Sequence, residues 1–509
     1  MVDLRKVDLK VVARKAMEQH GFEAVFPANL MAEVDALEDQ AHKAEPDARD
    51  LRGLLWSSID NSDSEDLDQV EYCERVQSGE ILVKVAIADV DVYVPEGSFA
   101  DEHARRNTTS VYTGIETYPM LPDRLSKGLS SLLPEQERLA VVVEFSVLPG
   151  GEVLPRGIYK ALVRNKAKLV YEEVGAWLEG SGPLPETVGS VPGLGAQLRL
   201  QDEASQRLEG YRVEQGALEL ETLEVRAILR QGKVSDLIAV HENRARQIIE
   251  NFMVAANGVM SGFLEKARIP TIQRVVRIPK DWNRIVEVAK ARGESLPAKP
   301  DAKALSEFLA NQKKADPELF PDLSLAIVKL LGSGEYVMYD SFQPNIGHFC
   351  LAVKDYTHGT APNRRYVDVV IQRLLKAALE KVPSPYGGKE LSKIAAWCTE
   401  REEASKKVER FMEKAEAAFV LSGKIGQSFN SIVTGASDHG TYVRLIAPPA
   451  EGRVMRGVRG LRVGQKVMVR LINLNPKKGF IDFEVAGWKG KRQKRSGGKG
   501  SRNWKHRRR

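Results

Sequence analysis

The chain has 509 residues, of which 43% are hydrophobic and 28% are charged, with a net charge of +6. This balance is typical of a globular protein with roughly two to four domains and a large core. No apolar run is long enough to cross a membrane and the first residues lack the apolar core of a secretory signal, so we expect no membrane segment. Three widely spaced cysteines argue against a zinc site or disulfide framework and favour a cytoplasmic location.

The first 50 residues are predicted to be helical, because apolar residues recur at helical spacing in two stripes. These stripes are Val7, Val11, Val12, Ala16 and Met17, then Leu30, Met31, Val34 and Leu37. The segment is a small helical module or a brace for the rest of the chain.

Strand-like sequence follows from about residue 54 to 163. The stretches 81–87, 91–94 and 139–147 are rich in β-branched residues and predict strands. Just before them, the segment 59–69 carries five carboxylates, which are Asp60, Asp63, Glu65, Asp66 and Asp68.

The acidic segment is the most informative feature of the chain. Asp66 and Asp68 alternate, so both point to one face of an extended segment. Apolar sequence on both sides predicts that the carboxylates lie at the edge of a core, where repulsion and desolvation favour neutralisation by a cation. Oxygen ligands without a nearby His or Cys favour a hard ion, Mg²⁺ or Mn²⁺, and a metal-dependent phosphodiesterase. The alternative is a solvated acidic loop, because Asp, Asn and Ser are common turn residues.

Long helical patterns occupy the middle of the chain, in 241–265, 367–382 and 390–421. Surface loops rich in Pro and Gly are expected at 182–195, 296–301 and 383–388.

From about residue 423, five short strand candidates separated by turn residues predict a small barrel of the OB type. They are 428–433, 440–445, 452–458, 466–471 and 479–485. OB barrels bind single-stranded nucleic acid with basic grooves and stacked aromatics, for which Phe429, His439 and Tyr442 are candidates. A purely structural barrel is the alternative. The tail 489–509 holds eleven Lys or Arg and no Asp or Glu, so we expect it to be disordered and to contact RNA phosphates, or to serve solubility alone.

Taken together, these features resemble the ribonuclease II/R family over roughly residues 50–487. The motifs that carry the resemblance are 59–69, 85–90, 118–122, 167–171, 249–257, 348–349 and 360–368. The resemblance implies an α+β fold in which an RNB catalytic module, a mixed sheet with surrounding helices, is followed by an S-one-type OB barrel. The expected parts are a helical segment 1–50, the RNB domain 51–420, the barrel 421–487 and the basic tail 488–509.

The resemblance also implies an activity, the 3′→5′ hydrolysis of single-stranded RNA to 5′-nucleoside monophosphates with Mg²⁺ at the end of a channel. Asp60 falls on a direct metal ligand and Asp66 on a supporting position. Asp68 falls on the residue that organises the second metal or the attacking water. Arg364 falls on the arginine that grips the scissile phosphate, where a planar guanidinium suits phosphate oxygens.

Four further residues fall on RNA contacts of the family. Tyr112 falls on an aromatic that stacks on bases near the channel end. Tyr171 and Glu250 fall on residues that contact the 3′-terminal nucleotides and read the 2′-hydroxyl, and Glu409 falls on a glutamate that lines the active site. As isolated residues, the tyrosines would be core or rim aromatics and the glutamates parts of solvated helix faces.

The chain departs from the family pattern at a metal-ligand position, where Gln69 replaces a fourth aspartate. A glutamine carbonyl coordinates Mg²⁺ without adding negative charge, so we expect weaker metal binding, with Asp63 or Glu65 as candidate substitutes. Leu218 or Leu220 occupies the place of a second stacking aromatic, which predicts a weaker hold on the bases.

Two more departures concern the phosphate motif and the channel entrance. Ala361 and Asn363 stand where the family has Ser and Ile. The family's two N-terminal cold-shock barrels are absent from this sequence, which predicts a more open entrance with RNA captured by the C-terminal barrel and tail.

Two functions from different classes follow. The first is an active 3′→5′ exoribonuclease whose partner is single-stranded RNA, with no obligatory protein partner evident. The second is a catalytically impaired RNB protein that binds RNA as a regulator or adaptor, which Gln69 favours. A general RNA-binding scaffold is a weaker third.

Overall fold

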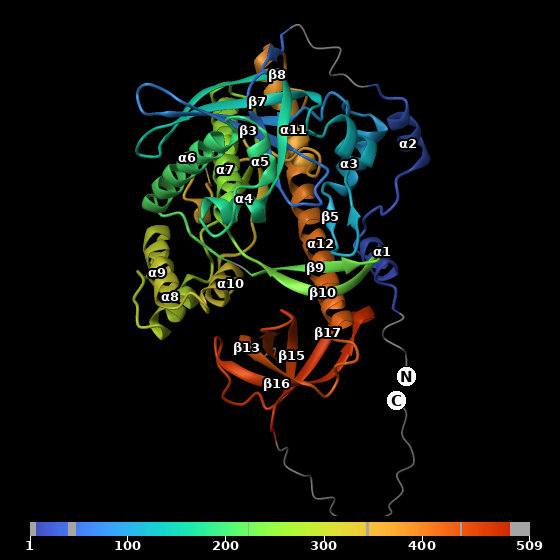
Figure 1. The fold of residues 1–509 in the computed structure, drawn as a ribbon, viewed down its shortest axis with the longest axis vertical. Helices are drawn as coiled ribbons and strands as arrows, with labels where there is room; N and C mark the ends of the chain where they lie inside the picture. The colour runs from blue at the N-terminus through green and yellow to red at the C-terminus, as the bar shows by residue number, and fades with distance from the viewer. Residues whose placement is uncertain (1–6, 39–46, 222, 343–345, 438–439, 489–509) are drawn as a thin grey trace, which may run out of the picture.

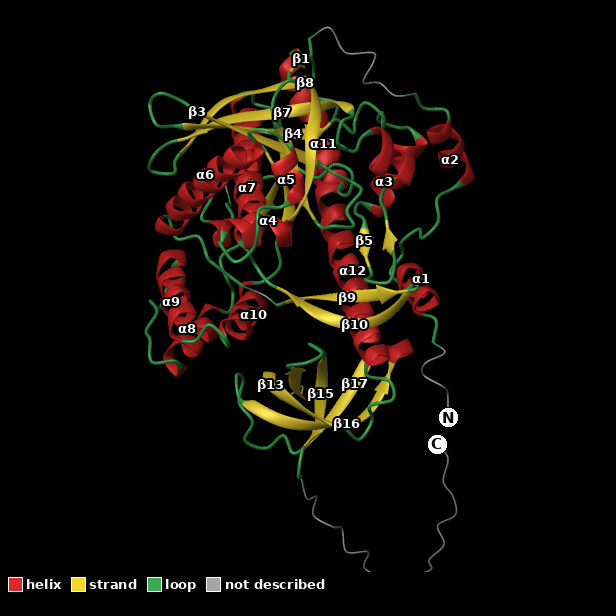
Figure 2. Ribbon diagram, viewed as in Figure 1, coloured by secondary structure: helices red, strands yellow, loops and turns green. Residues whose placement is uncertain are grey.

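The structure, a computed structural model, describes residues 7–38, 47–221, 223–342, 346–437 and 440–488. A mixed sheet with surrounding helices forms the upper part of the molecule in Figure 1, and a five-stranded barrel forms the lower part. The long helix α12 (Gly388–Val420) runs from one part to the other (Figure 2). The predicted fold class, an α+β catalytic module followed by a C-terminal OB-type barrel, is therefore confirmed.

The main sheet has the strand order β1-β8-β2-β3-β4-β7. Its strands are β1 (Arg49–Asp50), β2 (Trp56–Asp60), β3 (Gln69–Arg75), β4 (Ile81–Ala88), β7 (Glu137–Val147) and β8 (Val153–Val170). The long strand β8 pairs in parallel with β2 and antiparallel with β7, so the sheet curls round on itself. The parallel β2–β8 register ends at Asp60 opposite Val170, which brings the acidic segment to one edge of the sheet.

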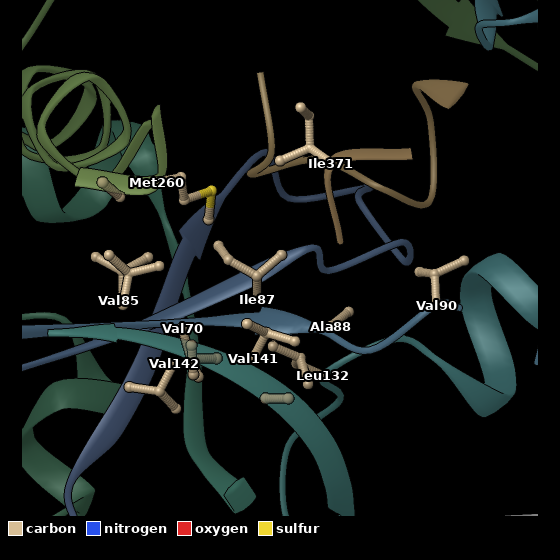
Figure 3. Packing of buried hydrophobic residues seen from close by; sticks show 14 of the residues in the cluster. Val70, Val85, Ile87, Ala88, Val90, Leu132, Val141, Val142, Met260 and Ile371 are labelled. Atoms are coloured by element: carbon tan, nitrogen blue, oxygen red, sulfur yellow. The ribbon is translucent and has the colours of Figure 1, made fainter. Parts of the chain in front are cut away.

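Helices cover the outer face of the sheet. Figure 3 shows Val85 and Ile87 of β4 on the face that Met260 and Ile371 approach from two helices. These helices are α7 (Arg244–Lys266) and α11 (Tyr366–Glu380), whose stretches were predicted as helices from their apolar periodicity. The same body contains α3 (Phe99–Asn107), α4 (Tyr171–Leu178), α5 (Glu186–Ser190), α6 (Leu194–Glu214) and the π-helical turn η3 (Arg124–Leu129).

The remaining elements connect the sheet and the barrel. They are the helices α8 (Trp282–Ala291), α9 (Ala302–Ala315) and α10 (Phe320–Leu331), the 3₁₀ turn η4 (Phe349–Leu351), and the strand pairs β5 (Val111–Tyr112) with β6 (Thr117–Tyr118), β9 (Glu224–Arg230) with β10 (Lys233–Val240) and β11 (Thr271–Val275) with β12 (Glu335–Tyr339). The helices α8, α9 and α10 enclose a separate apolar cluster that contains Trp282, Phe308 and Phe320.

Two helices precede the sheet, α1 (Leu9–Gln19) and α2 (Ala28–Asp35). The guanidinium of Arg401 on α12 lies 3.7 Å from the ring centroid of Phe22 and donates to the carbonyl of His20 at 2.8 Å. On α2, the carboxylate of Glu33 accepts hydrogen bonds from the first N–H groups of α3 at 2.9 Å. These helices therefore act as a brace on α12 and α3. Val11, expected on a buried stripe, is 50% exposed.

The C-terminal barrel is closed, with the order β13-β14-β15-β17-β16. Its strands are β13 (Ser428–Ser437), β14 (Gly440–Leu445), β15 (Glu451–Arg456), β16 (Lys466–Asn475) and β17 (Phe480–Val485), with a 3₁₀ turn η5 (Pro476–Lys478). Of the aromatics proposed to stack on bases, Phe429 packs partly buried against the barrel core and Tyr442 is half-buried. His439 and the basic tail lie outside the described residues.

The predicted strand at 91–94 is wrong. The backbone N–H groups of Tyr93 and Val94 donate to the carbonyl of Val90 at 3.0 and 3.1 Å, so this segment is a turn. The side chains of Arg373 and Lys376 on α11 bind the Asp91 carboxylate at 2.7 and 3.2 Å, and these contacts from a distant helix hold the turn. The predicted loop 182–195 likewise contains α5 and the start of α6.

Among the described residues, no helix combines the length and the apolar character that a membrane crossing requires.

A buried carboxyl lies on the last turns of α12. Glu416 is 3% exposed, and a Cβ atom added at Gly114 would come within 2.4 Å of its oxygens, so the carboxyl packs directly against this glycine. Burial raises the pKa of Glu416 to about 8, with a smaller contribution from the charge of Glu413. Because the folded pKa exceeds the unfolded value, the folded state holds the extra proton between about pH 4.5 and pH 8.

Glu416→Gln is expected to flatten the pH dependence of stability. The stabilisation that the parent draws from the protonated Glu416 is complete below about pH 4.5 and is lost as the pH rises through about 8. The variant should therefore be more stable than the parent by about 5 kcal/mol above pH 8 and equal to it below pH 4.5. Urea unfolding at a series of pH values measures this difference. Glu403→Gln, at an exposed position of α12, is the control, and an unchanged slope in the Glu416 variant would contradict the expectation.

Candidate active site

Asp60 is the last residue of β2 and lies beside β8. Its register partner is Val170, so Tyr171, the first residue of α4, follows directly beside it. Asp60 Oδ1 accepts hydrogen bonds from Ser64 Oγ at 2.9 Å and from the Asn61 backbone N–H at 3.2 Å. Burial raises the pKa of the Asp60 carboxyl, and these hydrogen bonds oppose the rise because they stabilise the charged form.

The loop 61–68 returns the chain to β3 and carries Asp66 and Asp68 to the same edge of the sheet. The Ser131 hydroxyl fixes this loop, because it forms hydrogen bonds of 2.9 and 2.7 Å with the main chain on both sides of residue 66. Asp68 is only 3% exposed. Burial raises its pKa to about 7, although the charge of Arg364 opposes the rise. The site is therefore acidic and strongly desolvated.

The segment 361–368 connects the acidic loop to the opposite wall of the site. The Asn363 backbone N–H donates to Asp68 Oδ1 at 2.9 Å, and Arg364 Nε lies 3.5 Å from Asp68 Oδ2. The Arg364 side chain is 44% exposed, so its guanidinium faces both the buried carboxylate and the solvent. This position suits an anionic ligand that approaches from outside.

The neighbouring arginine has a different role. Arg365 donates to Asp368 at 2.8 Å, and the Asp368 side chain is fully buried and also accepts the Ala361 backbone N–H at 2.8 Å. Arg365 therefore fixes the shape of this segment, whereas Arg364 is the arginine presented to a ligand.

Tyr112 lies at the end of β5 and faces the acidic loop. Its backbone is tied to the same segment, because the Ser110 N–H donates to the Arg364 carbonyl at 3.0 Å. The charges of Arg364, Asp66 and Asp68 all act on the Tyr112 hydroxyl. The residue is 45% exposed although its hydroxyl lies among buried groups, so part of the ring is accessible for stacking.

Tyr171 lies on the other side of Asp60. The charges of Asp60 and Arg364 act on its hydroxyl, and the Arg246 guanidinium lies 4.4 Å from the centroid of its ring. The structure thus brings together six of the predicted site residues, which are Asp60, Asp66, Asp68, Tyr112, Tyr171 and Arg364.

The two predicted glutamates occupy different places. Glu409 of α12 contacts Tyr112, because its Oε1 accepts the Tyr112 backbone N–H at 3.4 Å and the Ser405 hydroxyl at 3.0 Å. Glu250 of α7 is 60% exposed, and its Oε1 lies 4.0 Å from an Arg212 nitrogen. Glu409 therefore supports the Tyr112 backbone, while Glu250 belongs to a neighbouring cavity.

This cavity has a volume of about 260 Å³. Glu250 lines it together with Leu218 and Leu220, the residues expected in place of a second stacking aromatic. Both leucines also pack against the apolar cluster of α8, α9 and α10. Leu218 and Leu220 therefore give the cavity an apolar wall beside the Glu250 carboxylate, but no aromatic ring on which a base could stack at these two positions.

Gln69 begins β3 and is half-buried. Asp63 and Glu65, the expected substitutes for its missing charge, have side chains that are 75% and 67% exposed. Asp63 lies 3.6 Å from Arg226 and Glu65 lies 3.4 Å from Lys127. Both carboxylates are thus engaged elsewhere, and the structure does not support either as a substitute.

The donor chemistry of the site fits a hard divalent cation, because every acidic group at this edge offers oxygen. Asp60, Asp66 and Asp68 each have a pKa raised by burial, which is the state expected of carboxylates that lack a compensating cation. In the part of the chain that the structure describes, no three acidic, His or Cys side chains converge closely enough to form a complete metal cage. Binding would therefore draw these side chains together.

Three residues at or beside the site were not predicted as functional. Asn363 was noted only as a departure from the family pattern, and Ser131 carried no recognisable motif. Glu71 lies fully buried on β3, two residues after Gln69. The one sequence signal was a glutamate flanked by Val70 and Tyr72, but Gln69, Glu74 and Arg75 in the same strand make it too weak to mark Glu71 as buried.

Comparison with known proteins identifies the protein family to which the chain is similar. The RNB domain matches residues 48–381, and the RNase II-type exonuclease C-terminal S1 domain matches residues 427–486. The chain is 32% identical over 441 residues to Ribonuclease R of Thermotoga maritima, across 84% of this chain and 61% of that protein. It therefore spans about three fifths of the length of this relative.

Solved structures share the fold. RNase R of Mycoplasma genitalium in complex with ribose-methylated single-stranded RNA is similar with a TM-score of 0.82 and 24% identity, across 94% of this chain and 78% of that one. Yeast Ssd1, described as a pseudonuclease, is similar with a TM-score of 0.69 and 16% identity, across 88% and 56%. Because the RNB match covers most of the sequence, this chain belongs to the RNB family and carries an RNase II-type C-terminal S1 domain.

Proposed function

We propose that this chain is a metal-dependent exoribonuclease that hydrolyses single-stranded RNA from its 3′ end and releases 5′-nucleoside monophosphates. The observation that carries the proposal is the link between Asp68 and the segment of Arg364. A hydrogen bond of 2.9 Å from the Asn363 backbone holds the carboxylate, and the guanidinium lies 3.5 Å away. A phosphate gripped by Arg364 would thus lie directly beside the acidic group.

The other residues complete a binding site for a nucleotide. The exposed ring of Tyr112 is suited to stack on a base near the scissile phosphate. Tyr171, beside Asp60, and Glu250, in the neighbouring cavity, are the proposed contacts to the last nucleotides. A carboxylate that accepts a hydrogen bond from a 2′-hydroxyl favours RNA over DNA. Glu409 holds the Tyr112 backbone.

The proposed cofactor is Mg²⁺, with Mn²⁺ as a substitute, held by Asp60, Asp66, Asp68 and the Gln69 carbonyl. When bound, a divalent ion polarises the phosphate and lowers the pKa of an attacking water. The protein side chains contribute orientation, since Asp60 and Asp68 are each fixed by backbone hydrogen bonds.

RNA capture is assigned to the barrel (421–487) and the tail (488–509), beside the RNB domain (51–420) and the helical segment (1–50). A cavity of about 860 Å³ lies between the barrel, α10, α12 and the β9–β10 hairpin. Its lining also holds Glu413, Glu416 and Glu451, and two of its cations are paired, Arg444 with Asp322 and Lys406 with Glu402. The proposed counter-charges for phosphates are therefore Lys329, Arg410 and Lys414. The free thiols of Cys73, Cys350 and Cys398 support the proposed cytoplasmic location.

The alternative is a catalytically impaired RNB protein that binds RNA. The neutral side chain of Gln69 favours it, because a lost anionic ligand weakens metal binding. The yeast protein described as a pseudonuclease has the same fold, so this architecture also exists without nuclease activity.

RNA labelled at either end separates the two functions. We expect the parent chain with Mg²⁺ or Mn²⁺ to release labelled mononucleotide at once from 3′-labelled RNA, and to shorten 5′-labelled RNA stepwise. Asp68→Asn should lower the rate roughly a hundredfold or more, because it removes an anionic ligand of the divalent ion that would polarise the phosphate and activate the water. Glu74→Gln, at an exposed position of β3, the strand that follows Asp68, should leave the rate unchanged.

Binding without products would favour the alternative, and rescue of cleavage by Gln69→Asp would identify the missing charge as its cause. No RNA binding at all would overturn both proposals.

The two adjacent arginines should separate binding from stability. Arg364→Gln should weaken RNA binding and cleavage while changing the free energy of unfolding by less than about 1 kcal/mol, because its side chain is 44% exposed. Arg365→Gln should cost about 3 kcal/mol or more, because it leaves the buried Asp368 carboxylate without its cation. Urea unfolding and filter binding measure the two effects. Equal losses of stability would contradict the assigned roles.

A further inference from the structure

Glu71 is a buried carboxyl for which the fold offers no partner. Its residue is 0% exposed, and neither of its carboxyl oxygens forms a hydrogen bond within the described part of the chain. Buried polar groups in native proteins are nearly always paired, and a lone carboxyl in the core is costly. A valine or leucine at this position would satisfy the sheet equally well, so the carboxyl requires a functional explanation.

The strand register places Glu71 on the same face as Gln69. Gln69 is opposite Ile87 and Glu71 is opposite Val85 in the β3–β4 ladder, and residues two apart on a strand share a face. Figure 3 shows Val85 and Ile87 on the face that Met260 of α7 approaches. The Glu71 side chain therefore leaves the sheet on the same face as the Gln69 side chain, two residues further along β3 and deeper in the core.

Glu71 also lies near the acidic site. Its register partner on β2 is Ser57, on the strand that ends at Asp60. The charge of Asp60 acts on the Glu71 carboxyl, and the charges of both act on the Tyr171 hydroxyl. Glu71, a buried carboxyl without a hydrogen-bond partner among the described residues, thus lies close enough to Asp60 and Tyr171 to interact electrostatically with both.

We propose that Glu71 supplies the anionic metal ligand that Gln69 lacks, and that it reaches the divalent cation from the next position on the same strand face. The inference rests on the proposed function, since it needs a metal at this edge. With Asp60, Asp66 and Asp68, Glu71 restores four carboxylates around the site. Glutamate is one methylene longer than aspartate, which extends its reach from the deeper position.

A structural role provides the competing explanation. Ser57 Oγ and Gln201 Oε1 are also buried without hydrogen-bond partners among the described residues, and Gln201 Nε2 donates to the Glu71 carbonyl at 3.4 Å. Glu71 in its uncharged form, linked to these groups through water, would then serve only the core. In that case its removal would change stability and leave metal binding unaltered.

Binding of Mn²⁺ to the full chain, followed by the electron paramagnetic resonance signal of free Mn²⁺, separates the two roles without any measurement of activity. We expect Glu71→Gln to weaken Mn²⁺ binding at least tenfold, as Asp60→Asn does. Glu416→Gln, which removes a buried carboxyl on the last turns of α12 that is not among the proposed metal ligands, should leave binding unchanged. Urea unfolding of each variant without metal verifies that it is folded.

A double-mutant cycle with Gln69→Asp provides the second measurement. If Glu71 is a ligand, an aspartate at position 69 should restore Mn²⁺ binding strongly in the Glu71→Gln background and increase it little in the parent, because the two sites are coupled. Equal effects in both backgrounds, or unchanged binding in Glu71→Gln while Asp60→Asn weakens it, would overturn the inference and leave the proposed function intact. Absence of Mn²⁺ binding by the parent would overturn the proposed function itself.

Discussion

The hydrogen bond from the Asn363 backbone to Asp68 is the contact on which the site depends. It joins residues that are 295 positions apart and fixes a carboxylate that burial alone would make unstable as an anion. The same segment bonds to the strand that carries Tyr112, through the Arg364 carbonyl and the Ser110 N–H. Displacement of this segment would therefore move a carboxylate, a guanidinium and an aromatic ring together. The ion pair between Arg365 and the buried Asp368 within the segment opposes such a displacement.

The curled sheet explains why Asp60 and Asp68 lie at the same edge of the sheet. Asp60 ends a strand that is paired in parallel with β8, and Asp68 immediately precedes β3, so both lie where ladder hydrogen bonding stops. At such an edge the backbone groups of Asn61 and Asn363 remain available as donors to the carboxylates. These donors stabilise the charged forms only in part, since burial still raises the pKa of Asp60 and of Asp68. The negative charge of these carboxylates is thus only partly compensated by the protein, and a bound cation would compensate the rest.

The sequence predicted the features that depend on local pattern and failed where distant residues decide. The strands β4 and β7 and the helices α7, α11 and α12 follow from the period of their apolar residues. The segment 91–94 has strand composition, but Arg373 and Lys376 bind Asp91 and hold a turn. Glu71 escaped notice because a glutamate in a strand is ordinarily exposed, and only the packed structure, in which α6 lies against β3, reveals that it is buried.

Strand β3, which carries Gln69 and Glu71, provides the physical argument for choosing between an active site and a degenerate one. A site that no longer binds metal would gain stability by replacing buried carboxyls with apolar side chains, since such replacements in a core are often stabilising. This chain instead buries Asp68 and Glu71 almost completely, and it places the neutral Gln69 between them. A fold that bears the desolvation cost of these groups without a ligand would be less stable than its apolar counterpart. The physical argument therefore favours a site in which Glu71 carries the negative charge that Gln69 lacks. It argues against a site in which that charge is simply absent.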